Sequence, residues 1–162
     1  MKSIEQMPAN ARVWVYTSKN KFDEDDVNHI KVRLDEFIDS WDSHGELVDG
    51  GFEVRDNRFV IVYASEEGGR LCGRAADASV RIIQELEQEL ETELLNRLNI
   101  AYKQPKSDEV EVAPYAEFLK MVEANELSPA TTVYNNAVTT KAEFDKNWQQ
   151  PLSESWIKQQ VG

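Results

Sequence analysis

A glycine-rich segment between residues 66 and 79 holds the residue types best suited to chemistry in this chain. It concentrates positive charge beside the expected start of a helix, where backbone N–H groups and the helix dipole favour an anion. Arginine suits this role because its guanidinium group donates paired hydrogen bonds to phosphate or carboxylate oxygens. The candidate ligand-binding residues are Arg70, Gly73, Arg74, Asp77, Ser79 and Arg81. The segment therefore predicts a site for one small anion.

The same segment has the glycine spacing of a Walker A loop, the backbone cradle that holds nucleotide phosphates in P-loop proteins. Gly68 and Gly73 are separated by four residues, as in that motif. However, Arg74 stands where the motif requires lysine, and Ala75 stands where it requires a hydroxyl group for Mg²⁺. The helix is also expected to start too late, with Ser79 as its cap. These departures argue against nucleotide hydrolysis.

Cys72 is the one candidate for a catalytic residue. A thiol beside arginines and a helix N-terminus has its thiolate form favoured. A lone cysteine is more often a small buried apolar residue, and the sequence places neither histidine beside it. One cysteine and two histidines also supply too few soft ligands for a tetrahedral zinc site. We therefore expect no metal and no cofactor, and we favour a protein that is not an enzyme.

Acidic residues outnumber basic ones, with 30 Asp and Glu against 18 Lys and Arg in 162 residues and a net charge of −12. This balance argues against a general partner for nucleic acid or anionic membranes, since both require clustered positive charge. The longest apolar run, residues 59–64, is far shorter than the roughly 20 residues that cross a bilayer. The first residues lack the apolar core of a secretory signal, and the single cysteine fits a reducing compartment. We expect a cytoplasmic protein.

The elements that must position these residues follow the order β-α-β-β-α-β over residues 1–103. The strands are expected at residues 12–18, 52–55, 58–64 and 99–103. This order matches a ferredoxin-like α+β fold, in which an antiparallel sheet carries its helices on one face. The strand at 58–64 is almost continuously apolar, which predicts a central position covered on both faces.

The ends of the two helices are predicted from their capping residues. Asp23 is expected to cap the first helix, which ends at His44 and Gly45. Ser79 is expected to cap the second, whose apolar stripe continues to Leu98. A tight turn is expected at Asp56-Asn57, between the two middle strands.

Residues 104–162 are expected to add a β-α-β-α extension packed on this core, so that residues 1–162 form a single domain. The expected elements are strands at 109–113 and 132–138, a helix at 115–125 and a short helix that Thr140 and Glu143 cap. The large side chains of Trp148 and Trp156 indicate that the tail docks on the rest of the chain.

Several stretches resemble an uncharacterised family of bacterial proteins of about this length. They are residues 12–16, 58–62, 72–87 and 134–141, with Trp148, Pro151, Ser155 and Trp156. Family members sometimes carry the label "ABC transporter ATPase", but this sequence lacks an intact Walker A loop and a signature loop. The family's cysteine loop resembles Gly-Cys-Ser-Ile-Asp-Ser-Ser, and Arg74 and Ala75 depart from it. The resemblance implies one compact unit and no particular activity.

Three kinds of function stay open. The favoured one is a non-catalytic binding or protein-interaction module, assembled as a homo-oligomer or with a protein partner through a sheet edge, the open sheet face or the Trp-bearing tail. The second is a small enzyme or small-anion sensor that uses residues 68–81. The third is an acidic surface that mimics phosphate on a basic partner.

Overall fold

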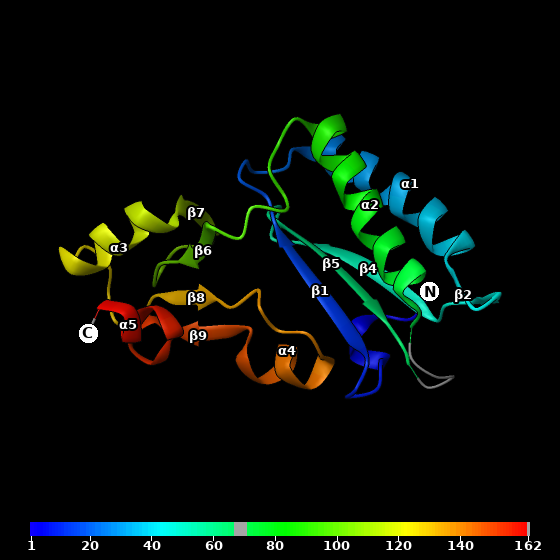
Figure 1. Ribbon diagram of the computed structural model, residues 1–162. Coiled ribbons are helices and arrows are strands. Elements are labelled where there is room, and N and C mark those ends of the chain that lie inside the picture. Colours follow the sequence, from blue (N-terminus) through cyan, green and yellow to red (C-terminus); the bar gives the residue numbers. More distant parts are fainter. Residues whose placement is uncertain (67–70, 162) are drawn as a thin grey trace.

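The structure, a computed structural model that describes residues 1–66 and 71–161, is mixed α+β with antiparallel sheets (Figure 1). The first elements are η1 (Ile4–Gln6), β1 (Arg12–Thr17), α1 (Glu24–Ser40), β2 (Asp42–Ser43), β3 (Glu46–Leu47), β4 (Gly50–Arg55), β5 (Phe59–Ala64) and α2 (Gly73–Leu90). The others are β6 (Asn99–Lys103), β7 (Glu111–Pro114), α3 (Tyr115–Glu123), β8 (Thr132–Tyr134), α4 (Lys141–Asn147), β9 (Gln149–Pro151), η2 (Leu152–Glu154) and α5 (Trp156–Val161). The predicted α+β class is confirmed.

The first sheet has the strand order β1-β5-β4, and both strand pairs are antiparallel. Every residue of the central strand β5 is buried. The β4–β5 hairpin turns at Asp56 and Asn57, whose φ angles are 56° and 54°. A tight hairpin turn requires such left-handed values, and Asp and Asn tolerate them. The predicted turn and the central position of the strand are confirmed.

Both faces of this sheet are covered. Helices α1 and α2 cover one face, where Leu34 and Ile83 share an apolar cluster with Val60. On the other face, Ile61 shares a cluster with Ile4 of η1 and Trp148. Side chains alternate along β5 and are apolar on both sides, so both faces must be removed from water. The open sheet face expected from a ferredoxin-like arrangement is therefore not available for docking.

The strand expected to complete this sheet, β6, lies in a second sheet of order β7-β6-β8-β9. The outer edge of β1 is instead taken by the segment before α4. Val13 donates its backbone N–H to the carbonyl of Thr139 at 3.0 Å, and Lys141 donates to the carbonyl of Ala11 at 2.9 Å. The prediction was wrong for this fourth strand, and the ferredoxin-like topology is not confirmed.

The second sheet is covered on one face by α3 and α5, where Tyr102 and Val133 pack with Phe118 and Ile157. On the opposite face, its Ala101 and Tyr134 join the cluster of Ile61 and Trp148. The two sheets thus share one apolar cluster. The division into a core of residues 1–103 and an extension of 104–162 within one domain stays a prediction.

The predicted helix ends need two corrections. Helix α1 begins after its cap Asp23 as expected but ends at Ser40, because His44 and Gly45 form the turn between β2 and β3. Helix α2 begins earlier, with Cys72 at its N-cap position, and Ser79 lies inside it. There the Ser79 hydroxyl donates to the carbonyl of Ala76 at 2.6 Å.

Helix α2 also ends before Leu98. Glu91 follows it with a φ of 53°, and the Glu87 carboxylate accepts the backbone N–H groups of Leu94 and Leu95 at 2.7 and 2.9 Å. These bonds satisfy the backbone in a turn, which explains why the apolar stripe continues beyond the helix. Within residues 1–66 and 71–161, no helix has the length and apolar composition needed to cross a bilayer.

Candidate functional site

The anion site predicted from the sequence falls at the N-terminal end of α2. Arg70, with Gly68 and Gly69, lies outside the described residues. Among the others, Gly73, Arg74, Asp77 and Arg81 are exposed, whereas Ser79 is fully buried. Arg74, Asp77 and Arg81 make no ion pair with a described residue. The described part of this segment therefore offers exposed charges.

Cys72 is half-buried, and its backbone N–H donates to the Ser43 hydroxyl at 3.0 Å. Hydrogen bonding by Ser43 lowers the pKa of the thiol, helped by the backbone N–H groups of Ala75 and neighbouring residues. His44 contributes to this shift through its backbone. The ring of His29 instead contacts the Glu89 carboxylate. The structure thus places a thiol with a lowered pKa at the helix start, and the contact it gives between this thiol and His44 is through the His44 backbone.

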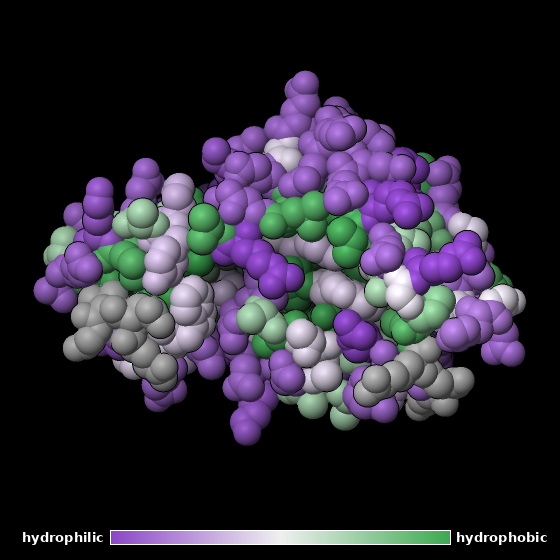
Figure 2. Space-filling model, in the orientation of Figure 1, coloured by the Kyte–Doolittle hydropathy of each residue, from purple (hydrophilic) through white to green (hydrophobic). Residues whose placement is uncertain are grey.

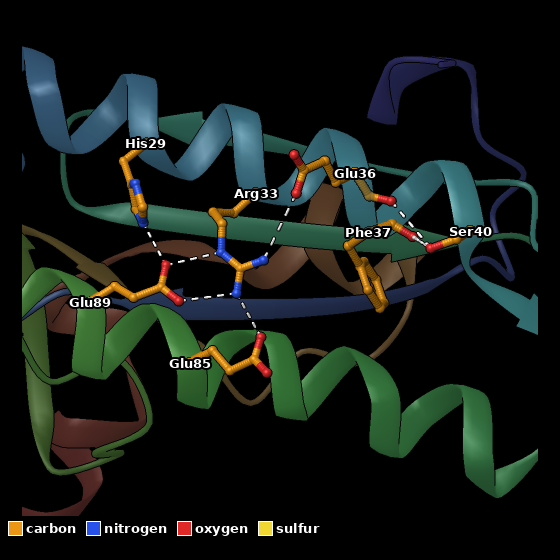
Figure 3. Close-up of polar contacts among 7 residues, drawn as sticks. All are labelled: His29, Arg33, Glu36, Phe37, Ser40, Glu85 and Glu89. Carbon is orange, nitrogen blue, oxygen red and sulfur yellow. Dashed lines mark hydrogen bonds and ion pairs between the residues drawn. The ribbon is translucent and has the colours of Figure 1, made fainter.

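A polar network joins α1 to α2 on a surface that is mostly hydrophilic (Figure 2). His29 and Arg33 point from α1 toward Glu85 and Glu89 of α2 (Figure 3). The Glu89 carboxylate accepts from Arg33 at 3.0 Å and contacts the His29 ring at 2.5 Å, while Arg33 also donates to Glu85 at 2.8 Å. Arg33, and then His29, lower the pKa of Glu89, which keeps this carboxylate ionised. The network joins the two helices and holds Glu89 as an ion-pair partner rather than as a proton donor.

A hollow of about 350 Å³ lies on the second sheet, at the end where the β6–β7 turn begins. Strand pairing sets Lys103 opposite Thr132 and Tyr134 opposite Gln149. Paired residues share a face, as do residues two apart on a strand, so these four side chains lie on the face away from α3 and α5. The turn of residues 104–108 forms the remaining wall, with Lys106 and Asp108 lining it. We call this site the Lys103–Lys106 hollow.

Hydrogen-bond donors without partners gather in the Lys103–Lys106 hollow. Among the residues that the structure describes, Lys103 and Lys106 form no ion pair. The side chains of Thr132, Tyr134 and Gln149 likewise have no hydrogen bond within that part of the chain. Burial raises the pKa of Tyr134 to about 12, and nearby Asp56 adds to the shift. Its phenol therefore stays protonated and can donate.

A second hollow of about 300 Å³ adjoins the first through Gln149 and is lined also by Glu5, Arg55, Phe144, Asp145 and Trp148. The Arg55 guanidinium lies 5.5 Å from the ring centre of Phe144 and 5.4 Å from that of Trp148. It is also paired with Glu53 at 2.7 Å. Because Arg55 is already bound to the chain's own groups, this hollow is better explained as packing than as a site.

Sequence reasoning missed the Lys103–Lys106 hollow. The available signal was limited to Lys103 as the last residue of a predicted strand and to the turn that follows it. Thr132 and Gln149 come from distant parts of the chain, and only strand pairing brings them to Lys103. In the described part of the chain, no three His, Cys, Asp or Glu side chains gather as a metal site.

Comparison of the chain with protein-family models, curated proteins and solved structures gave no match. The resemblance to an uncharacterised bacterial family therefore stays a prediction.

Proposed function

We propose that this chain is a non-catalytic binding module that holds a small polar ligand in the Lys103–Lys106 hollow. The observation that carries the proposal is the convergence on one concavity of five polar side chains that have no ion-pair or hydrogen-bond partner among residues 1–66 and 71–161: Lys103, Lys106, Thr132, Tyr134 and Gln149. Donors that converge on a hollow without partners among the described residues are available to bind a polar ligand. The volume of about 350 Å³ is in the lower range of small-molecule sites.

The chemistry of the lining groups supports binding rather than catalysis. A general base or acid works best when its pKa lies near the operating pH. Tyr134, with a pKa of about 12, keeps its proton at neutral pH. Thr132 and Gln149 do not titrate in that range, and each can only position a ligand through hydrogen bonds. The site is therefore suited to holding a molecule unchanged.

A thermal-shift screen tests this proposal with a panel of organic acids, phosphate esters, amino acids, nucleotides and neutral polyols. A specific ligand should raise Tm with a saturable concentration dependence, because it binds only the folded chain. It should also move the backbone amide NMR signals of residues 103–108 and 132–134. A panel without a single such ligand, or a ligand whose signals map elsewhere, would reject the hollow as the binding site.

We propose a thiol function at Cys72 as the second candidate, since Ser43 lowers the pKa of this thiol. The alkylation rate of wild-type protein by iodoacetamide, measured against pH, should then have its midpoint below that of a free thiol. The Ser43→Ala variant should move the midpoint upward, and Ser40→Ala, which changes another serine hydroxyl on the nearby end of α1, should not. Identical profiles for all three proteins would remove this candidate.

We also keep the expectations of a cytoplasmic location and of a homo-oligomer or protein partner as proposals. Sedimentation of the purified chain as a monomer at high concentration would remove the homo-oligomer.

A further inference from the structure

We infer that the ligand of the Lys103–Lys106 hollow presents an oxyanion, a phosphate or carboxylate group, to the two lysines. This inference rests on the proposed function and adds the charge of the ligand. It follows from the balance of donors and acceptors in the hollow. Two ammonium groups, three hydroxyl groups and two side-chain amides line it, and Asp108 is its single carboxylate.

Lys103 and Lys106 form no ion pair with a described residue, whereas half of the eight other lysines do. Lys2, Lys19, Lys21 and Lys141 each pair with a carboxylate, at 2.6 to 3.9 Å. Of the carboxylates that follow the turn, Asp108 lines the hollow itself, whereas Glu109 binds Lys21 at 2.7 Å and Glu111 accepts from the Gln104 amide at 2.8 Å. The positive charges of Lys103 and Lys106 are thus left to act on a ligand, even though the chain carries a net charge of −12.

The neutral groups of the hollow match an oxyanion as well. Thr132 and Tyr134 can each turn an O–H toward a ligand oxygen, and burial keeps the Tyr134 phenol protonated. Phosphate and carboxylate oxygens have enough lone pairs to accept from these hydroxyls and from both ammonium groups at once. A neutral ligand would leave half-buried Lys103 without a charged partner. When an oxyanion ligand also carries a hydroxyl group, the Asp108 carboxylate can accept a hydrogen bond from that hydroxyl.

Lys106 permits a test that separates binding from folding. It has a φ of 70°, in the left-handed region, where asparagine is better tolerated than lysine. Lys106→Asn should therefore leave Tm unchanged or raise it while removing one ammonium group from the hollow. Lys103→Gln removes the other ammonium group and keeps a side chain of similar length. Lys120→Gln is the matched control, because Lys120 is exposed on α3 and does not line the hollow.

The experiment titrates the full chain and these three variants with inorganic phosphate, citrate and the neutral polyol erythritol. Sodium chloride holds the ionic strength constant. We expect at least one anion to bind saturably and to move the amide signals of residues 103–108, with no effect of erythritol. Kd should rise about tenfold or more in Lys103→Gln and Lys106→Asn, since each loses one charge-assisted contact. The Lys120→Gln variant should bind as the wild type does.

Equal responses to phosphate in all four proteins would overturn the inference, because excluded salts stabilise any folded chain without a site. Binding of a neutral panel compound in the hollow, with neither anion binding, would overturn the inference but leave the proposed function standing. Failure of every compound would reject both. A response to phosphate without citrate, or the reverse, supports the inference and identifies the oxyanion.

Discussion

At the scale of single residues, glycines of this chain have opposite structural roles. A Cβ atom on Gly50 would lie 2.8 Å from the backbone carbonyl oxygen of Tyr63 and 2.8 Å from the ring of Trp41. Gly73, the first residue of α2, has nothing within 4 Å of the same position. In the sequence, Gly50 is followed by Gly51 and Gly73 lies close to Gly68 and Gly69, so composition alone does not distinguish them. The packing around Gly50 leaves no room for a side chain, whereas the surroundings of Gly73 leave room for one.

We predict that Gly50→Ala destabilises the protein by about 1–3 kcal/mol, because the added methyl group must displace the backbone of a central strand. Gly73→Ala should be neutral or stabilising by up to about 1 kcal/mol, since alanine loses less entropy in a helix. Urea unfolding midpoints of the two variants and the wild type measure both effects. A Gly50→Ala variant as stable as the wild type would contradict the packing described for β4.

At the scale of elements, the polar network that forms the clamp between α1 and α2 shows how charged side chains of two helices join those helices in the fold. In the sequence, Glu85 and Glu89 are four residues apart, so they share one face of the helix, but no local pattern names their partner. The structure pairs Glu85 and Glu89 with Arg33 of the neighbouring helix. The pKa of Glu89 is lowered in the folded chain from its ordinary value of 4.5, so the ionised form is the stabilising one.

We predict that Glu89→Gln lowers the free energy of unfolding by about 0.5–1 kcal/mol at neutral pH, the range for a partly exposed ion pair. The stabilisation by Glu89 is fully present above pH 4.5 and is lost as pH falls through the lower pKa of the folded state. Urea unfolding of both proteins between pH 7 and pH 3 should show the difference shrinking in that acidic range. Gln88→Ala, at an exposed neighbour outside the clamp, should show no such dependence. A difference that is constant over the whole pH range would contradict the clamp.

At the scale of the whole molecule, the apolar cluster shared by the two sheets decides how the chain behaves as a unit. Trp148 is buried in it and contacts Phe59 of the first sheet and Tyr134 of the second, with ring centres 5.0 Å apart in both cases. Its indole N–H donates to the Asn136 side chain at 3.1 Å. A residue placed between two sheets in this way should couple their unfolding.

We predict one cooperative unfolding transition, with coincident urea curves from circular dichroism and tryptophan fluorescence. Trp148→Ala should cost about 3–5 kcal/mol, the usual loss for a truncated core tryptophan. In Trp148→Ala, amide hydrogen exchange should be faster than in the wild type at both Val60 and Ala101, which lie in different sheets. Trp156→Ala, which acts on the tail beside Tyr115, should affect the second sheet more strongly. Two separate transitions, or acceleration in one sheet only for Trp148→Ala, would show two independent units.

The sequence by itself determined the elements whose signals are local. The continuously apolar strand β5, the Asp23 cap of α1 and the Asp56-Asn57 turn were all predicted, because each depends on neighbouring residues and on the backbone preferences of their own types. The N-cap of α2 was predicted at Ser79 but lies at Cys72. Several residues of this segment can occupy an N-cap position, and the sequence does not show which of them does.

Only the tertiary structure decided where β6 pairs and what lines the Lys103–Lys106 hollow. Hydrogen-bonding groups on the edge of β1 are satisfied by residues 139–141, and a strand has no preference of its own for one edge over another. Once β6 pairs with β8, Lys103 is set against Thr132 and close to Gln149. The candidate site is thus made by contacts between distant segments, and no local pattern in the chain encodes it.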